Sequence, residues 1–343
     1  MTSLSLRALG RALGRDGPKV NSIGFGAMST GGVYGPAGTD KERFELLDRA
    51  HELGNTFWDT ADMYADSEDV IGKWFKKTGK RNDIFLATKF GLVPEDGRLV
   101  IKSFPGFVKA ASCERSLARL GVDVIDLYYC HRVDGKTPIE KTIEAMVESK
   151  KQGKIKYLGL SEVSSQTLRR AHAVHPISAL QIEYSPFALD IEDPKIGLLE
   201  TCRELGIAIV AYSPMGRGLL TGVKTYQDVA ADPFLSTLPK MSKENFPKIL
   251  ELVDKIKDLA KKKGCTPAQL TLTWVMAQGD DDFIPIPGTR KPKYLEENFK
   301  AQEVVLGREE VQELREAANR TQVPGARYPE AFVPFVLGDT PAL

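Results

Sequence analysis

Cysteine and histidine are scarce in this sequence, with four of each among 343 residues. No two cysteines have C-x-x-C or zinc-knuckle spacing, which argues against a structural zinc site and against a thioredoxin-type redox motif. Isolated cysteines are typical of a reducing compartment, where the side chain behaves as a small apolar group. They are Cys113, Cys130, Cys202 and Cys265. We therefore predict no metal site.

Excess charge and long apolar runs are also missing. Lysine and arginine number 47 against 46 acidic residues, a net charge of +1, so no overall field attracts nucleic acid or an anionic membrane. No run approaches the roughly eighteen apolar residues of a membrane span. The start, MTSLSLRALGRALG, lacks the apolar segment and cleavage site of a signal peptide. We expect a cytoplasmic protein without nucleic-acid or membrane partners.

Eight apolar, strand-like segments alternate with helical patterns along the chain. Because these strands are apolar throughout, they predict a parallel sheet covered by helices, and eight such units predict a closed (β/α)8 TIM barrel. An open doubly wound sheet is the rival, but no G-x-G-x-x-G follows the first strand. The predicted strands cover residues 20–28, 55–61, 83–90, 124–132, 155–162, 178–185, 206–214 and 282–289.

The chain contains no linker that would divide it, so we predict a single domain over residues 1–343. Residues 1–19 resemble a glycine-punctuated hairpin, and residues 222–245 form the largest insertion, an irregular one. The tail of residues 321–343 is rich in proline, glycine and aromatic side chains. In a barrel of this kind, the insertion and the tail are expected on the face where loops carry the active site.

Four polar side chains of different types follow successive predicted strands: Asp59, Tyr64, Lys89 and His131. Singly, each has an ordinary structural explanation, such as a helix cap, a rim tyrosine or a structural histidine. At adjacent strand ends, however, they meet at one mouth of the barrel. This joint placement favours a catalytic explanation.

Proton donation to a carbonyl uses such a set. A free phenol, with a pKa near 10, is about three units too weak an acid at neutral pH, or roughly 4 kcal/mol. A buried ammonium lowers that pKa, and a carboxylate compensates the buried ammonium. We therefore predict a relay in which Asp59 holds Lys89, Lys89 tunes Tyr64, and His131 orients the substrate oxygen.

A protonated carbonyl also needs a nucleophile, and a hydride carrier would supply one. The loop after the seventh strand, AYSPMGRGLLTG, combines a tyrosine ring with glycines whose backbone N–H groups suit a diphosphate. After the eighth strand, Thr289, Arg290, Lys291 and Lys293 precede a predicted helix, an arrangement typical of phosphate sites. Taken alone, the second segment could equally be a solvated basic turn.

These motifs together resemble the aldo-keto reductase superfamily over nearly the whole chain. The similarity includes IGFGAM, DTADMY, ATKFG, IDLYYCHRVD, GKIKYLGLSE, LQIEYSPF, VAYSPMGRGLLTG and IPIPGTRKPKYLEEN, in the same order and spacing. The sequence is most similar to the YakC-type and perakine-reductase-like branch, followed by pyridoxal reductases. This resemblance implies a barrel capped by the N-terminal hairpin, and NADPH bound in an extended form without a Rossmann fold.

The resemblance also implies roles for individual residues. Asp59, Tyr64, Lys89 and His131 match the family's catalytic tetrad, Ser161 and Gln181 the contacts to the nicotinamide amide, and Tyr212 the ring that stacks on nicotinamide. The diphosphate loop corresponds to Ser213, Pro214, Met215, Gly216, Arg217, Gly218 and Leu219. The 2′-phosphate end corresponds to Gly288, Arg290 and Tyr294, and the adenine edge to Glu297 and Asn298.

Two positions depart from the family pattern. Glu162 stands where many relatives have asparagine beside the nicotinamide amide, and Tyr294 stands where some branches have arginine or glutamine. Arg290, with Lys293 as an assisting point charge, must then carry the charge at the 2′-phosphate, so we predict a strong preference for NADPH over NADH. Arg290 has the two-pronged geometry that phosphate oxygens accept.

The leading interpretation is NADPH-dependent reduction of aldehydes, with ketones as a second class. A non-catalytic NADPH-binding subunit, like the β subunits of potassium channels, is the alternative, but those subunits lack the histidine that corresponds to His131. A Schiff-base lyase acting through Lys89 would leave Asp59 and Tyr64 without a joint purpose. The sequence specifies neither the physiological substrate nor the oligomeric state.

Overall fold

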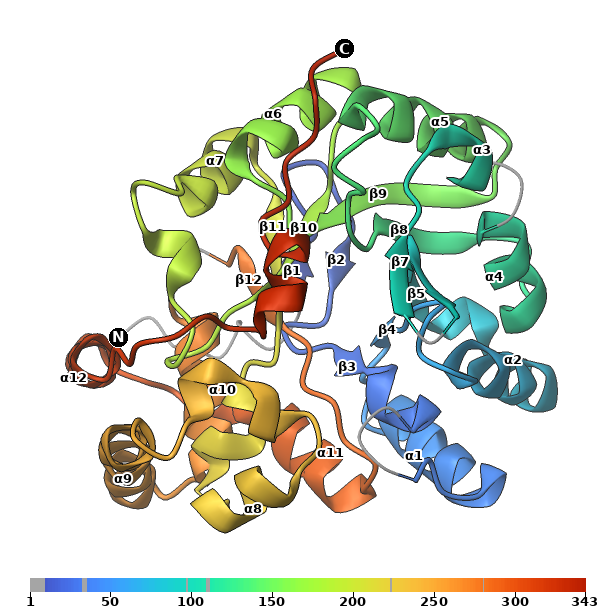
Figure 1. The fold of residues 1–343 in the computed structure, drawn as a ribbon. Coiled ribbons are helices and arrows are strands. Elements are labelled where there is room, and N and C mark those ends of the chain that lie inside the picture. Colours follow the sequence, from blue (N-terminus) through green and yellow to red (C-terminus); the bar gives the residue numbers. More distant parts are fainter. Residues whose placement is uncertain (1–9, 33–35, 97, 109–111, 223, 280) are drawn as a thin grey trace.

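A closed barrel of eight parallel strands forms the centre of the protein (Figure 1). The computed structural model describes residues 10–32, 36–96, 98–108, 112–222, 224–279 and 281–343. The strands follow the order β12-β11-β10-β9-β8-β5-β4-β3. A parallel bridge between Gly26 and Gly288 joins β3 to the segment after β12 and closes the ring. The predicted (β/α)8 barrel is therefore confirmed.

The predicted strands lie where the sequence places them, within a few residues, and helices alternate with them as expected. The barrel strands are β3 (Phe25–Gly26), β4 (Phe57–Asp59), β5 (Phe85–Phe90), β8 (Ile125–Cys130), β9 (Ile155–Ser161), β10 (Ala179–Glu183), β11 (Ala208–Tyr212) and β12 (Phe283–Pro285). The longer helices are α1 (Asp40–Glu52), α2 (Ser67–Thr78), α4 (Cys113–Leu120), α5 (Ile139–Lys151), α6 (Ser165–Val174), α7 (Leu198–Leu205), α9 (Phe246–Lys263), α10 (Pro267–Met276), α11 (Pro292–Phe299) and α12 (Arg308–Arg320).

Local sequence signals explain where these helices begin and end. The hydroxyl of Thr39 accepts from the backbone of Glu42, whose carboxylate accepts from the backbone of Thr39, a capping box that starts α1. Gly54, just after α1, adopts a φ of 75°, which glycine tolerates at little cost. Thr266 and Gln269 form the same capping box at α10.

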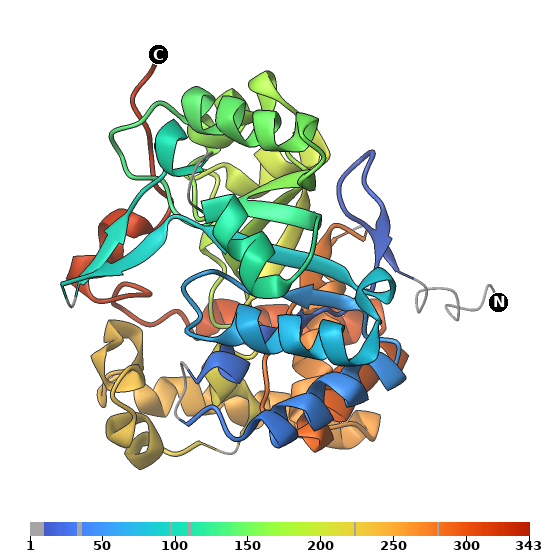
Figure 2. The same cartoon turned by 90° about the vertical axis from the view of Figure 1, so that its right-hand side faces the viewer.

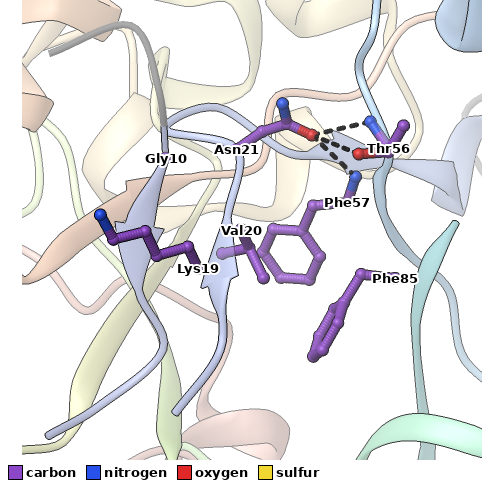
Figure 3. A pocket seen from close by; sticks show the side chains of 7 residues that line it. All are labelled: Gly10, Lys19, Val20, Asn21, Thr56, Phe57 and Phe85. Carbon is purple, nitrogen blue, oxygen red and sulfur yellow. Dashed lines mark hydrogen bonds between the residues drawn. The ribbon is translucent and has the colours of Figure 1, made fainter. Parts of the chain in front are cut away.

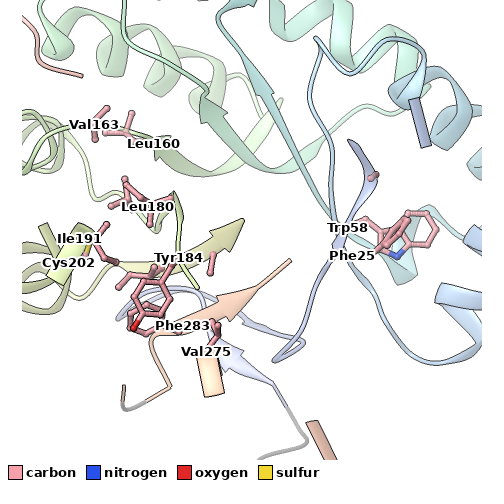
Figure 4. Packing of buried hydrophobic residues seen from close by; sticks show 14 of the residues in the cluster. Phe25, Trp58, Leu160, Val163, Leu180, Tyr184, Ile191, Cys202, Val275 and Phe283 are labelled. Carbon is pink, nitrogen blue, oxygen red and sulfur yellow. The ribbon is translucent and has the colours of Figure 1, made fainter. Parts of the chain in front are cut away.

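Side-chain alternation divides the core into two layers. Leu127 and Tyr129 of β8 point into the barrel, whereas Tyr128 and Cys130 belong to the outer layer between strands and helices. The outer layer includes Trp58, which packs edge-on against Phe25 with ring centroids 6.2 Å apart (Figure 4). The inner layer consists of Leu13, Val20, Phe57, Ala87, Leu127, Tyr129, Ala179, Ala208, Val210, Ile284 and Ile286.

An N-terminal hairpin of β1 (Arg11–Ala12) and β2 (Lys19–Val20) covers the end of the barrel where the strands begin. Its Leu13 and Val20 belong to the inner layer, and the guanidinium of Arg11 donates to the carbonyl of Met276 at 2.8 Å. This confirms the predicted cap over its described part; residues 1–9 lie outside the described residues. A pocket beside the hairpin is lined by Gly10, Lys19, Val20, Asn21, Thr56, Phe57 and Phe85 (Figure 3). The pocket lies where the barrel strands begin, whereas Asp59, Lys89 and His131 lie where the strands end.

The structure adds elements that the sequence analysis did not predict. Strands β6 (Leu92–Glu95) and β7 (Arg98–Ile101) form a hairpin after β5, on the same side of the molecule as the tail (Figure 2). The Asp-Gly pair between these strands is a recognised hairpin signal. The insertion expected to be irregular contains α8 (Tyr226–Ala231), which begins with a capping box. A short helix, α3 (Pro105–Phe107), precedes α4.

The tail after α12 turns back across the barrel and includes a short 3-10 helix, Glu330–Phe335 (Figures 1 and 2). Within the described residues, no helix is both long enough and apolar enough to cross a membrane. The assignment of the whole chain to one domain of residues 1–343 stays a prediction.

Candidate active site

A buried ion pair lies at the carboxyl ends of β4 and β5. Lys89 Nζ donates to Asp59 Oδ1 at 2.5 Å and to the carbonyl of Thr60 at 2.6 Å. The side chain of Lys89 is fully buried, and that of Asp59 is 2% exposed. Gln181, from β10 across the barrel, donates to the other oxygen of Asp59 at 2.8 Å. The charge of Lys89 therefore has a carboxylate partner that is itself held in place.

Tyr64 and His131 lie next to the Asp59–Lys89 pair. Lys89 Nζ is 4.8 Å from the centroid of the Tyr64 ring, and the rings of Tyr64 and His131 meet edge to face at 5.9 Å. Tyr64 sits in a tight turn after β4, where its backbone N–H donates to Ala61. His131 directly follows β8. The four residues that the sequence predicted for catalysis are thus brought together.

Burial dominates the protonation of this group. It raises the pKa of Tyr64 well above the ordinary value, and Asp59 raises it further. Burial also lowers the pKa of Lys89, which Asp59 opposes. The expected net lowering of the Tyr64 pKa by Lys89 is not found, because burial and Asp59 outweigh the opposing effect of the cation Arg132. Tyr64 is consequently a protonated phenol at neutral pH, which is the state of a proton donor.

His131 is neutral in this environment. Burial lowers its pKa well below the usual value, and the cations Arg132 and Lys89 add to the effect. Its Nδ1 is buried without a hydrogen-bond partner among the described residues. Since native proteins rarely leave such atoms unpaired, this imidazole is suited to bind a polar ligand atom.

The residues expected at the nicotinamide amide are already hydrogen-bonded within the protein. Ser161 Oγ, at the end of β9, accepts from Arg132 at 3.0 Å, and Gln181 donates to Asp59. Arg132 was not predicted as a site residue, although it directly follows His131 in the sequence. Its guanidinium also donates to the carbonyl of His131 at 2.6 Å, which places a cation beside the proposed proton donor.

The loop after β11 has the backbone of an anion site. Four of its residues adopt positive φ: Ser213 at 49°, Gly216 at 55°, Arg217 at 57° and Gly218 at 85°. Such conformations turn successive backbone N–H groups toward one side and form a concavity that favours negative charge. The loop lies at the carboxyl end of the strand that ends in Tyr212. The backbone N–H groups of Gly216 and Gly218 donate within the loop, to Ser213 and Met215, and the predicted contact of this loop with a diphosphate stays a prediction.

The segment after β12 presents exposed cations at the start of α11. Arg290 donates to the carbonyl of Pro36 at 2.6 Å, and Lys291 lies 5.7 Å from the ring centroid of Tyr294, which is 45% exposed. Gly288 lies against the neighbouring strand, where a Cβ would sit 2.8 Å from the carbonyl oxygen of Gly26. The absence of a side chain at Gly288 therefore lets its backbone approach that of Gly26. The side chains of Arg290 and Lys291, which follow it, are exposed and accessible to a phosphate. Glu297 and Asn298 follow on α11, with Asn298 buried.

Among the described residues, no group of three or more histidine, cysteine or acidic side chains could hold a metal ion. A sequence profile described as the Aldo/keto reductase family matches residues 22–319. The chain belongs to the aldo/keto reductase family. It is therefore an oxidoreductase, and members of this family use NADPH.

Similar proteins extend over nearly the whole of this aldo/keto reductase. It is 56% identical to aldo-keto reductase str7 of Strobilurus tenacellus over 346 residues, covering 99% of both chains. It is 49% identical to aldo-keto reductase yakc [NADP(+)] of Schizosaccharomyces pombe over 338 residues, covering 97% of this chain and 98% of the relative. The resemblance to the YakC-type branch is thereby confirmed.

Solved structures agree with this assignment of the aldo/keto reductase. A glycerol dehydrogenase from Gluconobacter oxydans superposes with a TM-score of 0.80 at 28% identity, covering 92% of this chain and 96% of that one. A thermostable aldo-keto reductase in complex with the inhibitor epalrestat superposes with a TM-score of 0.71 at 30% identity, covering 90% and 99%. Family membership and barrel are thus supported by both sequence and structure.

Proposed function

We propose that this protein reduces aldehydes, and ketones as a second class, to alcohols with NADPH. The observation that carries the proposal is the buried Asp59–Lys89 pair directly beside Tyr64, with neutral His131 across from the phenol. This set delivers a proton to one oxygen atom and leaves the adjoining carbon open to a nucleophile. Proton delivery to the oxygen and an open carbon are the two features that carbonyl reduction by a hydride donor requires.

Each residue then has a defined task. Neutral His131 donates a hydrogen bond to the substrate oxygen and sets its angle to Tyr64. Tyr64 transfers its proton to that oxygen as negative charge develops there, and the Lys89 ammonium stabilises the phenolate that remains. Asp59 keeps Lys89 charged and in place, since an unpaired buried ammonium tends to lose its proton. Solvent later returns a proton to Tyr64.

NADPH, when bound, supplies the hydride that the carbonyl carbon accepts. The residues that would hold it are Tyr212 and the positive-φ loop at 213–219, together with Arg290 near the 2′-phosphate. The name of the Schizosaccharomyces pombe relative specifies NADP(+), which supports this choice of cofactor. Ser161 and Gln181 would exchange their present partners, Arg132 and Asp59, for the nicotinamide amide.

The direct test is the oxidation of NADPH in the presence of 4-nitrobenzaldehyde, followed by absorbance, with the alcohol product identified by chromatography. We expect one alcohol formed for each NADPH consumed. A protein that binds NADPH tightly but turns over none of a broad panel of aldehydes and ketones would instead support the non-catalytic, channel-subunit type of function.

A further inference from the structure

The side chain of Glu162 is turned toward the C-terminal tail. Arg327 donates from its two terminal nitrogens to the two carboxylate oxygens of Glu162, both at 3.0 Å. The side chain of Arg327 is 6% exposed, and that of Glu162 is fully buried. Burial alone would raise the pKa of Glu162, but Arg327 and Arg132 outweigh it and hold that pKa at about 2. The pair is therefore fully charged at neutral pH.

The same carboxylate also orients the ring expected to stack on nicotinamide. The hydroxyl of Tyr212 donates to Glu162 at 2.8 Å and lies 2.9 Å from the hydroxyl of Tyr328 in the tail. Because the proton of Tyr212 is used toward Glu162, Tyr328 is the donor to Tyr212. One acidic side chain thus connects a barrel strand, the expected nicotinamide ring site and the tail.

Backbone contacts extend this connection. The carbonyl of Glu162 accepts from the backbone N–H of Gly338 at 2.8 Å, and the backbone N–H of Leu337 donates to its carboxylate at 3.3 Å. Glu162 adopts a φ of 51°, a conformation that a residue with a side chain reaches only at some cost. Such strain at a non-glycine position indicates that the side chain itself is required there.

A second contact joins the tail to the diphosphate loop. The guanidinium of Arg217 lies between the rings of Phe234, in the insertion, and Tyr328, at 5.3 and 4.8 Å from their centroids. Arg217 also pairs with Glu183 at 3.1 Å, and Glu183 lies 3.5 Å from Arg327. Insertion, loop and tail therefore meet through paired charges and through the guanidinium of Arg217, which packs on both rings.

We propose that the Glu162–Arg327 pair, here called the tail anchor, positions the tail as a wall of the carbonyl-substrate pocket and sets the orientation of Tyr212. The inference rests on the proposed reductase function and adds two positioning residues to it. With both oxygens of Glu162 engaged by Arg327, Tyr212 and Leu337, the acid serves the tail rather than the nicotinamide amide. The tail reaches the site through Tyr328, whose hydroxyl lies 2.9 Å from that of Tyr212, so an aldehyde large enough to extend from Tyr64 to the tail loses most when the wall is lost.

A second two-pronged pair that contacts the tail offers a matched control. Arg170 of α6 pairs with Glu140 of α5 at 2.7 Å for both contacts, and donates to the carbonyl of Thr340 in the tail at 2.8 Å. This pair ties down the last residues of the chain on α5 and α6, away from Tyr64 and Tyr212. R170M should loosen the tail end without changing the pocket.

The test combines hydrogen exchange of the full chain without cofactor and steady-state kinetics with a ring-bearing and a small aldehyde. In R327M we expect faster exchange over residues 326–337, and a KM for 4-nitrobenzaldehyde raised roughly fivefold or more. The KM for propanal and the dissociation constant of NADPH should each change less than about twofold, because Glu162 still accepts from Tyr212 in this variant and only the pocket wall is lost. E162Q should act in the same direction, and R170M should leave all kinetic constants unchanged.

Several outcomes would overturn the proposal. These are unchanged exchange in R327M, equal KM increases for both aldehydes, or an R170M variant as impaired as R327M. If R327M does not fold, R327K keeps the charge but loses the two-pronged contact, and it should show a smaller effect in the same direction. A wild-type protein without any reductase activity would contradict the proposed function and the role of the tail as a substrate wall. The comparison of hydrogen exchange in R327M and wild type would still show whether the Glu162–Arg327 pair holds the tail in place.

Discussion

The two charged regions of this protein differ in how they hold their charge. At the catalytic centre, Lys89 is fully buried and depends on one carboxylate, Asp59. At the start of α11, Arg290, Lys291 and Lys293 are exposed to solvent. A buried charge without its partner is strongly destabilising, whereas an exposed cation is stabilised by water alone. Substitutions at the catalytic centre should therefore alter both turnover and the free energy of unfolding. Substitutions at the start of α11 should alter only the binding of a phosphate.

The largest effect is expected for Tyr64. Y64F removes the proton donor and keeps the ring, so turnover should fall by about 10²–10⁴-fold, the usual contribution of a general acid. NADPH binding should be retained, because the lost contact acts in the transition state. Turnover is measured by NADPH oxidation, and binding by fluorescence titration. Near-normal reduction by this variant would remove Tyr64 from the mechanism.

The next prediction sharpens the contrast between buried and exposed cations. K89M should lower turnover by orders of magnitude, because no ammonium remains to stabilise the phenolate. It also leaves Asp59 buried without its cation, which should cost about 3–5 kcal/mol of unfolding free energy. Denaturant unfolding measures this loss, with K293M on α11 as the control, expected within about 0.5 kcal/mol of wild type. A stable K89M would mean that the pair does not hold this part of the barrel together.

D59N tests the pair from the other side and should be less damaging than K89M near neutral pH. Burial already lowers the pKa of Lys89, and Asp59 is the main group that opposes this. Without the carboxylate the pKa falls further, so the charged form is lost as pH rises. The deficit of D59N relative to wild type should therefore grow as the pH rises.

The measurement for D59N is the pH profile of kcat/KM for both enzymes. Burial and the neighbouring Glu68 raise the pKa of Asp62 to about 7, but this group is common to both proteins, and only the difference between the profiles reports on Lys89. A deficit that shrinks at high pH, or a D59N enzyme worse than K89M, would contradict the proposed order of the relay.

The smallest effect is expected at the exposed end. R290A should weaken NADPH binding roughly tenfold or more, since charge-assisted hydrogen bonds contribute about 1.5–3 kcal/mol each. NADH binding should hardly change, because NADH lacks the 2′-phosphate. Fluorescence titration with both cofactors measures this, with K291A as the control. Because Arg290 also donates to Pro36, equal losses for both cofactors would mean that it holds the loop instead of the phosphate.

Sequence periodicity by itself determined the barrel and the meeting of its four polar residues. Apolar strands of regular spacing demand a parallel sheet, and parallel strands place their carboxyl ends at one edge, so Asp59, Lys89 and His131 had to be neighbours. The β6–β7 hairpin was also within reach of the sequence, through the Asp-Gly pair between its two strands in the sequence. Such signals are local, and each is readable in a short stretch of chain.

Only the tertiary structure decided what surrounds that centre. The sequence placed Glu162 near a nicotinamide amide, but its partner, Arg327, lies 165 residues away, and no local pattern predicts such a pair. The direction of the Tyr64 pKa likewise depends on how deeply the barrel buries the phenol, since burial outweighs the nearby cation Arg132. Strand ends follow from periodicity, whereas desolvation and long-range ion pairs exist only once the chain has packed.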